Sequence, residues 1–308
     1  NQKYLVYKNI ILRNLYGVDI MHEATEIARL RLFLKMMAVV DVDPYDENLG
    51  LDPLPDIDFN VKCGNTLVGY ASEQEIQDGL VNGDMFAYVE LKKRIDDEMT
   101  KASAAFDYFR REQLNLLGSH ADLIKAKKEI NQRLAAIRVL LDRQLYATNG
   151  GGKTYDQWHK DTQPFHWYTE FYPVMAQRGG FDVIIGNPPY VEWKEKEAPY
   201  KISSRLKCGN LYGFCAERCL SLGLDGAFSF IVPVAITWSK RMGGVIDILR
   251  RKSTAIWFSS FDDRPGKLFE MIEHLRASIF IVNRMVARQQ CIYSTKYNRW
   301  PTEYRSKL

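Results

Sequence analysis

The feature that most restricts how this chain can fold is an apolar run followed, after one asparagine, by two consecutive prolines. The run, Phe181–Gly186, is continuous and of strand length, which is typical of a strand buried on both faces of a sheet. Asn187, Pro188, Pro189 and Tyr190 follow it directly. Because the two prolines fix φ and remove two backbone donors, we expect a rigid turn immediately after a buried strand.

Three more runs with the character of buried strands follow this turn. Their continuous apolar composition favours a mostly parallel sheet covered by helices, which indicates an α/β fold. Ligands bind at the carboxyl edge of such sheets, so the polar tetrad that follows Gly186 is expected at that edge. The runs are 227–232, 256–261 and 277–282, and helices are expected at 211–223 and 240–252.

Residues 1–72 also have a mixed α/β pattern. Leu15–Ile20 is a short apolar run with a carboxylate near its end, and it predicts a buried strand. Helical periodicity follows over residues 22–40. Residues 58–63 predict a second strand, which ends just before Asn65.

Residues 73–152 differ from the rest of the chain. No proline occurs between Pro55 and Pro164, charge is dense, and apolar residues recur at helical spacing. This pattern predicts two long antiparallel helices with a turn near Gly118–His120, each of about 30 residues and about 45 Å long. The expected organisation is a first α/β part at 1–72, a helical-hairpin insertion at 73–152 and a second α/β part at 153–308.

Composition argues against several classes of protein. The chain of 308 residues is 46% hydrophobic and 26% charged, which is typical of a globular protein rather than a disordered one. We expect no membrane association and a cytoplasmic location, because no apolar stretch has membrane-helix length and no signal peptide is visible. The five cysteines are irregularly spaced, so no metal site and no disulfide framework is expected.

The polar tetrad has the chemistry needed to methylate an amino nitrogen. The side-chain oxygen of Asn187 and the carbonyl of Pro188 can accept hydrogen bonds from one amino group, and Tyr190 offers a flat face to a base. An amino nitrogen conjugated to a ring is a poor nucleophile, because its lone pair is delocalised. Two fixed acceptors draw this nitrogen toward tetrahedral geometry and stabilise the positive charge that develops during attack.

The tetrad and several other segments together resemble the gamma-type amino-group DNA methyltransferases, which use S-adenosylmethionine and modify adenine N6. The pattern is most similar to the methylase part of large fused, type IIG-like, restriction–modification proteins, and it extends over nearly everything except the helical insertion. The resemblance implies a Rossmann-like methyltransferase sheet, with the catalytic part at 153–308. The segments that carry it are Asn14–Ile20, Cys63–Leu67, Phe181–Tyr190, Asn210–Arg218, Gly226–Pro233, Phe261–Phe269 and Ala277–Val282.

The resemblance also implies a cofactor site. Asp19 would accept both ribose hydroxyls of S-adenosylmethionine, Ile20 would pack on its adenine, and Asn65 would hydrogen-bond that adenine at a position where relatives often have Asp. Phe214 would either line the cofactor pocket or belong to the core.

A second set of residues would act on double-stranded DNA. The resemblance makes Asn187, Pro188, Pro189 and Tyr190 the catalytic loop, with Tyr190 and Phe269 stacking on a flipped-out adenine. Ordinary core packing is the alternative for Phe269. A run of basic residues just after the tetrad could contact phosphates or form a solvated loop, and its members are Lys194, Lys196, Lys201, Arg205 and Lys207.

The pattern departs from the family in two places. No glycine-rich strand–turn–helix is visible in the residues before Asp19, so we expect the central first strand and its cofactor loop to be missing. We also expect the specificity domain to be missing. We therefore expect a fragment that works with the remainder of a longer polypeptide, and that by itself binds the cofactor weakly and has little activity.

Other functions remain compatible with these residues. A protein-glutamine N5 methyltransferase would use the same tetrad on a planar amide nitrogen, and RNA base methylation is a further variant. A non-catalytic DNA-binding or assembly fragment, with the helical hairpin as its interaction arm, is the alternative from a different class.

Overall fold

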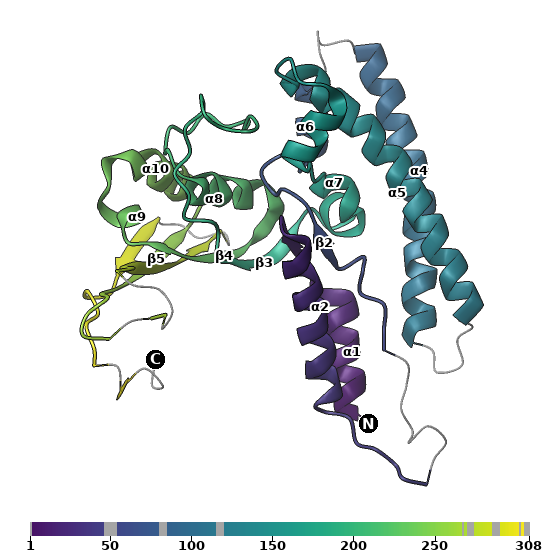
Figure 1. Ribbon diagram of the computed structural model, residues 1–308, viewed down its shortest axis with the longest axis horizontal. Helices are drawn as coiled ribbons and strands as arrows, with labels where there is room; N and C mark the ends of the chain where they lie inside the picture. The colour runs from purple at the N-terminus through teal and green to yellow at the C-terminus, as the bar shows by residue number, and fades with distance from the viewer. Residues whose placement is uncertain are drawn as a thin grey trace. The chain divides into compact units, whose positions relative to one another are not determined.

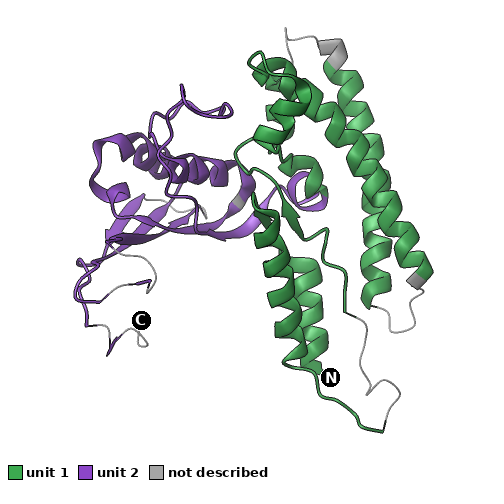
Figure 2. Cartoon of the chain, viewed as in Figure 1, with its two compact units in different colours: residues 1–172 green, residues 173–308 purple. Residues whose placement is uncertain are grey.

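The computed structural model describes residues 2–45, 54–79, 85–114, 120–266, 268–269, 274–284, 290–301 and 303–304. The chain divides into two compact units, Asn1–Tyr172 and Pro173–Leu308 (Figure 2). Each unit has its own sheet, with two strands in the first and five in the second. None of the helices in the described ranges is both long and apolar enough to cross a bilayer.

The sheet of the first unit is a single pair of parallel strands. Strand β1 (Gly17–Asp19) lies beside β2 (Val61–Cys63) in a register that places Asp19 opposite Cys63. Helix α1 (Gln2–Asn14) precedes β1, and α2 (His22–Met37) follows it. The two strands and the helix that the sequence predicts here are present, with the strands shorter than expected. The expectation that the strand at 15–20 is buried is wrong, because Leu15 is 41% exposed and Ile20 is 44% exposed.

Two long helices form the hairpin that the sequence predicts. Helix α4 (Met85–Leu114) packs along α5 (His120–Asn149), as Figure 1 shows. Their shared core consists of apolar side chains that are at most 2% exposed, including Ile95, Met99, Ile130, Ile137 and Leu141. Gly118 and Ser119, where the turn is predicted, lie outside the described residues.

Short helices connect the hairpin to the rest of its unit. Helix α3 (Glu73–Asp78) comes before the hairpin, and Ser72 caps its first turn. Helices α6 (Tyr155–Thr162) and α7 (Trp167–Glu170) come after the hairpin. Thr154 caps α6 by accepting a hydrogen bond from the Gln157 amide.

A buried ion network connects the hairpin to β2. Glu170, whose side chain is 3% exposed, accepts from Lys62 Nζ at 2.7 Å and pairs with Arg138 Nη2 of α5 at 2.6 Å. Burial alone would raise the pKa of Glu170, but the two adjacent cations hold its pKa at about 2. Burial lowers the pKa of Lys62, which outweighs the opposite effect of Glu170. A buried carboxylate with two cationic partners costs much more to leave unpaired than a surface one.

The second unit is a five-stranded sheet in the order β3-β4-β6-β5-β7. Helices α8 (Leu211–Leu222) and α10 (Gly243–Arg251) lie over one face of the sheet (Figure 1). The π-turn Pro173–Gln177, helix α9 (Ala235–Trp238) and the 3-10 turn Lys240–Met242 complete the unit. The strands are β3 (Phe181–Gly186), β4 (Gly223–Pro233), β5 (Ala255–Phe261), β6 (Ala277–Asn283) and β7 (Cys291–Ser294).

The expectation that these strands run mostly parallel is wrong for β6. Strands β3 and β4 are parallel, as are β5 and β7, but β6 lies antiparallel between β4 and β5. The connection from β5 to β6, residues 262–276, contains no helix among its described residues. A parallel return usually requires a crossover helix, so a connection of this kind brings the chain back in the opposite direction.

The expectation that β3 is buried on both faces is also wrong. Val183 is 66% exposed and Ile185 is 79% exposed, although Ile184 is partly covered. The reason is topological: β3 is an edge strand of its sheet, and within the described residues β4 is its only partner. In the same way, β1 pairs only with β2 in the described part of the chain. An apolar edge strand of this kind is an exposed site for pairing.

The ion network predicts a specific pH dependence of stability. The pKa of Glu170 is about 2 in the folded chain and 4.5 as its ordinary value, so its contribution is complete above pH 4.5 and is lost as the pH falls toward about 2. We therefore expect the free energy of unfolding in urea to fall less steeply over this window in Glu170→Gln than in the wild-type chain. Glu195→Gln, on an exposed loop, should retain the wild-type slope. Equal slopes for Glu170→Gln and the wild type would contradict this assignment.

Candidate functional site

The polar tetrad lies at the carboxyl end of β3, where the sequence places it. Asn187 and Pro189 are exposed, Pro188 is buried and Tyr190 is half-buried. Because β3 and β4 are parallel, their carboxyl ends meet at the same edge of the sheet. The tetrad therefore projects from this edge next to the end of β4.

The Tyr190 hydroxyl closes the turn back on itself. It lies 2.5 Å from Asn187 Oδ1 and 2.9 Å from the carbonyl oxygen of Ile231 on β4. A hydroxyl has one hydrogen, so it donates to one of these acceptors at a time. Burial raises the pKa of Tyr190, which keeps the hydroxyl protonated as a donor. Asn187 Oδ1 has two lone pairs, so a second donor can still reach it.

The loop after the tetrad returns to the sheet at a defined point. The amide of Leu211 donates to Val191 O at 3.0 Å, and the amide of Trp193 donates to Gly209 O at 3.0 Å. Asn210 then caps α8 by accepting from the Tyr212 amide. The loop is thus closed at its base, next to the tetrad.

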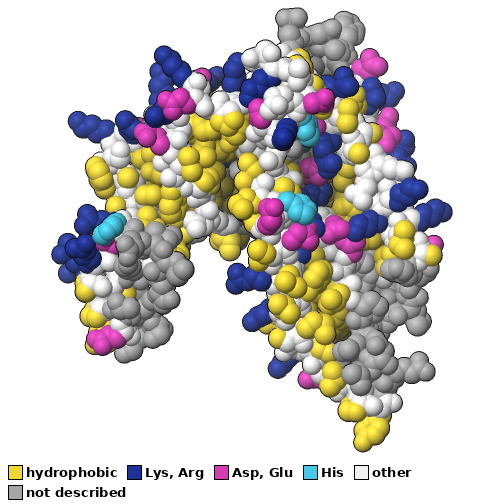
Figure 3. Space-filling view, viewed as in Figure 1, with side chains coloured by type: hydrophobic (Ala, Val, Ile, Leu, Met, Phe, Trp, Pro, Cys, Tyr) yellow, Lys and Arg dark blue, Asp and Glu magenta, His cyan; other side chains and the backbone are white. Residues whose placement is uncertain are grey.

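The predicted basic residues all lie on this loop and are exposed. Figure 3 shows Lys and Arg side chains over the part of the second unit where Figure 1 draws the loop. Lys194 Nζ lies 3.3 Å from Glu197, an exposed pair that contributes little to stability. The exposed members are Lys194, Lys196, Lys201, Arg205 and Lys207.

In the first unit the structure brings together the three residues predicted to bind the cofactor, which are Asp19, Ile20 and Asn65. Asp19 ends β1, and its carbonyl accepts a hydrogen bond from the Gly64 amide at 2.8 Å. This bond brings residues 64–69, which follow β2 and are named the Asn65 turn, next to the end of β1. Asp19 is exposed, and Ile20 is 44% exposed beside it.

The hydrogen-bonding capacity of this group fits a nucleoside. Asp19 Oδ1 accepts from the Met21 amide at 2.8 Å, which leaves Oδ2 without a hydrogen bond within the described ranges. Asn65 is 3% exposed, its Oδ1 accepts from the Leu67 amide, and its Nδ2 has no partner in the described part of the chain. An unpartnered buried amide donor is costly unless a ligand satisfies it. A carboxylate for ribose hydroxyls, an apolar surface for a ring and a free amide donor are therefore close together.

The remaining two predicted residues lie in the second unit. Phe214 is on α8 and is only 6% exposed. Phe269 is half-buried and follows the segment 262–266. The cofactor group of Asp19, Ile20 and Asn65 and the tetrad thus belong to different units.

Sequence reasoning missed the polar residues that surround the Asn65 turn. His166 and Asp142 are buried side chains joined by a 3.0 Å contact, and neither belongs to a recognisable motif. Trp167 Nε1 donates to Thr66 Oγ1 at 3.1 Å from the same segment. The only signal in the sequence is the presence of ionisable residues within otherwise apolar segments.

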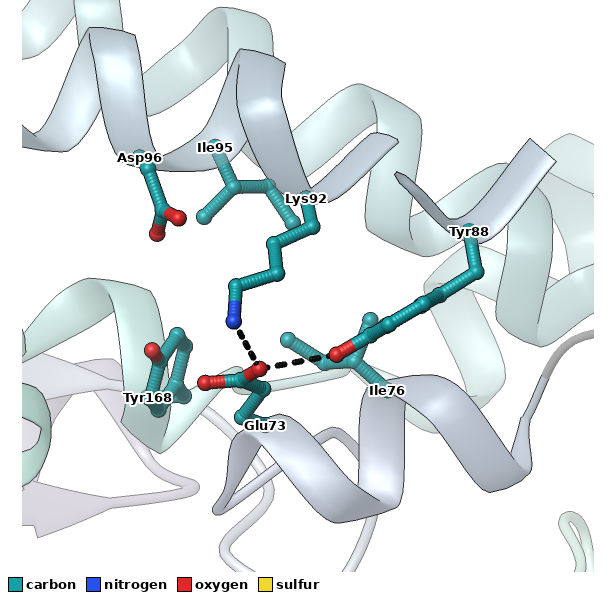
Figure 4. A pocket seen from close by; sticks show the side chains of 7 residues that line it. All are labelled: Glu73, Ile76, Tyr88, Lys92, Ile95, Asp96 and Tyr168. Carbon is teal, nitrogen blue, oxygen red and sulfur yellow. Dashed lines mark hydrogen bonds and ion pairs between the residues drawn. The ribbon is translucent and has the colours of Figure 1, made fainter. Parts of the chain in front are cut away.

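A small pocket lies elsewhere in the first unit, between α3, α4 and α7 (Figure 4). Glu73 accepts from the Tyr88 hydroxyl at 2.8 Å and pairs with Lys92, and these bonds lower the pKa of Glu73. These two bonds connect α4 to α3. Among the described residues no group of three or more His, Cys, Asp and Glu side chains could hold a metal ion.

Comparison with known proteins supplies the family context. Residues 13–254 match the family model described as Eco57I restriction-modification methylase. A protein of Methanocaldococcus jannaschii named "Putative type II restriction enzyme and methyltransferase" is 29% identical over 271 residues, and the match covers 74% of this chain and 23% of that protein. The chain thus spans about a quarter of this relative's length.

Solved structures show weaker similarity. A nuclease-deletion mutant of the Type ISP restriction-modification enzyme LlaGI, in complex with a DNA substrate mimic, has a TM-score of 0.36 and 13% identity, over 60% of this chain and 20% of that one. The DrdV–DNA complex has a TM-score of 0.33 and 16% identity, over 43% of this chain and 16% of that one. Similarities of this size do not indicate what a chain binds.

The closed geometry of the tetrad predicts an energetic coupling between Tyr190 and Asn187. In a double-mutant cycle of Tyr190→Phe and Asn187→Ala, the free energies of unfolding in urea should be non-additive by about 0.5–1.5 kcal/mol, as for one hydrogen bond. Tyr293→Phe, also a partly exposed tyrosine of the same unit, combined with Asn187→Ala is the matched control and should be additive. Additivity of the Tyr190 and Asn187 changes would show that the hydroxyl does not bond to this amide in solution.

Proposed function

Because this chain belongs to the Eco57I restriction-modification methylase family, we propose that it carries out methyl transfer to DNA with S-adenosylmethionine as the methyl donor. The finer proposal is transfer to N6 of an adenine that has been flipped out of the duplex. The observation that carries the proposal is the tetrad itself: an exposed Asn187 amide and the Pro188 carbonyl follow directly on β3, at the edge shared with β4. Acceptors on a proline-fixed turn suit a planar amino group.

The tetrad would act on the amino nitrogen of the target base. Asn187 Oδ1 and the Pro188 carbonyl would accept hydrogen bonds from its two N–H groups. These bonds would hold the nitrogen in place and stabilise the positive charge that it develops. Donors or acceptors fixed before the reaction need no reorganisation as charge develops, which makes them more effective than water. The Tyr190 hydroxyl, now 2.5 Å from Asn187 Oδ1, would donate to Ile231 O instead when the base is bound.

The residues that would hold the cofactor are those at the ends of β1 and β2. When bound, S-adenosylmethionine supplies an electrophilic methyl group on a positively charged sulfur. Asp19 would accept from its ribose hydroxyls, Ile20 would cover one face of its adenine, and Asn65 Nδ2, which lacks a partner in the described residues, would donate to that adenine. Phe214, on α8, is also proposed as a cofactor-binding residue.

Double-stranded DNA is the proposed partner. Flipping a base costs a few kcal/mol, and stacking on Tyr190 and Phe269 would return about 1–3 kcal/mol per contact. The exposed loop that begins next to the tetrad carries five cations, and it would neutralise phosphates beside the flipped base. Because the chain spans only part of the relative that it matches, the remainder of a longer polypeptide is proposed to complete the cofactor site and to read the DNA sequence.

The direct test uses the whole polypeptide that carries this chain. Labelled methyl groups are supplied on S-adenosylmethionine, and duplex DNA is digested and analysed for N6-methyladenine by mass spectrometry. The wild type should produce it, and Asn187→Ala should lower kcat by at least about 100-fold, as for loss of one preorganised partner, with a fall in DNA affinity of no more than about tenfold. Asn9→Ala, the same chemical change on α1, is the matched control and should leave the rate unchanged.

Three outcomes would contradict the proposal. Methylation that survives in Asn187→Ala would remove the tetrad from the reaction. Label in protein glutamine instead of DNA would favour the glutamine methyltransferase. Tight DNA binding without any methyl transfer by the wild type would favour a non-catalytic assembly role.

A further inference from the structure

The Asn65 turn is joined along its length to the segment 163–168. The Asn65 amide donates to Gln163 O at 2.8 Å, and the Phe165 amide donates to Val68 O at 2.7 Å. The Tyr168 amide donates to the Tyr70 carbonyl at 3.1 Å. Whatever fixes the segment 163–168 therefore also fixes the turn that carries Asn65.

His166 connects this segment to the hairpin through both nitrogens of its ring. Its Nδ1 accepts a hydrogen bond from the Tyr70 amide at 3.2 Å, so Nδ1 carries no hydrogen. The hydrogen is then on Nε2, which donates to Asp142 Oδ1 of α5 at 3.0 Å. His159 Nε2 lies 3.3 Å from the other oxygen of Asp142. Asp142 and His166 are both 1% exposed, so water does not compete for these bonds.

Glu170 makes the second connection, one helical turn away. Arg138 precedes Asp142 by four residues, so the two side chains lie on the same face of α5. Arg138 binds Glu170, and Glu170 binds Lys62, which is next to Cys63 at the end of β2. The two ends of the Asn65 turn, near Lys62 and near Tyr70, are thus both held by one face of α5.

The ion pairs of Arg133, in contrast, do not leave the hairpin. Arg133, five residues before Arg138, pairs with Glu98 of α4 at 2.8 Å and with Glu129 of its own helix. These bonds stay within the hairpin. Arg133 therefore only holds the two hairpin helices together, whereas Arg138 also connects the hairpin to the turn.

We propose that the helical hairpin is a positioning element of the cofactor site, in which Arg138 and Asp142 act through Glu170 and His166 to fix the turn that presents Asn65. The identity of the ligand rests on the proposed function. The bracing of the turn does not, because it follows from the bonds within the first unit. Arg138, Asp142, Glu170 and His166 are positioning residues, since none of them is required to touch the cofactor.

The test compares Arg138→Met with Arg133→Met in the whole polypeptide that carries this chain. In Arg138→Met we expect hydrogen exchange at the Asn65 and Tyr70 amides to accelerate about tenfold and KM for S-adenosylmethionine to rise about tenfold, while kcat stays within about twofold. Arg138→Lys, which can still reach Glu170, should restore most of both. Arg133→Met should leave the exchange rates and the KM near the wild-type values, even if it lowers the melting temperature as much as Arg138→Met does.

The outcomes separate this proposal from the proposed function. Equal exchange in Arg138→Met and Arg133→Met would overturn the bracing role. Faster exchange at Asn65 in Arg138→Met with no change in KM would overturn the proposal that this bracing positions the cofactor site. If the wild type neither binds S-adenosylmethionine nor transfers methyl groups, the proposed function fails. The exchange comparison alone then decides whether the hairpin holds the turn.

Discussion

The two prolines after β3 fix the turn on which the proposed chemistry of this chain depends. If the strand continued past Gly186, its backbone amides and carbonyls would form hydrogen bonds within the sheet. Pro188 and Pro189 have no amide hydrogen and cannot donate such bonds. The chain therefore leaves the sheet at a fixed angle, with the Asn187 amide exposed and Pro188 buried beneath it. Rigid acceptors at the end of a parallel strand pair are the feature on which the proposed reaction depends.

In the first unit, the proposed cofactor residues likewise lie at the ends of two parallel strands, β1 and β2. There the polar groups come from a turn rather than from prolines, so the turn needs external support. The structure supplies that support through buried ion pairs and a histidine of fixed tautomer, and these connect Asn65 to a helix that is distant in the sequence. The long hairpin thereby gains a role in the first unit beyond that of an appended arm.

Local patterns in the sequence predicted most of the elements but not their environment. The strand at 181–186, the two long helices and the tetrad follow from runs of apolar residues, helical spacing and proline chemistry, all of which act over a few residues. The direction of β6 could not be predicted in this way, because apolar periodicity is the same for parallel and antiparallel strands. The exposure of Val183 and Ile185 depends on which strands pair, and that is a property of the whole sheet.

The bracing of the Asn65 turn was beyond prediction for a related reason. Lys62 and Glu170 are 108 residues apart, and nothing in either local sequence marks them as partners. The Asp19, Ile20 and Asn65 group did emerge from the sequence, because the resemblance to the gamma-type methyltransferases implies it and each residue lies at or near the end of a predicted strand. How these residues take part in catalysis is a proposal that rests on chemistry and on family membership.

The most direct test of the central idea asks whether Asn187 recognises the amino group that is to be methylated. The dissociation constant of the whole polypeptide is measured for its DNA substrate with adenine at the target position, and for the same duplex with purine, which lacks the 6-amino group. Purine pairs more weakly than adenine and is easier to flip in both proteins, so the two proteins are compared by the ratio of their dissociation constants for purine and adenine. If Asn187 Oδ1 accepts from the amino group, this ratio should be about tenfold larger in the wild type than in Asn187→Ala. An equal preference for adenine in the wild type and in Asn187→Ala would contradict the account.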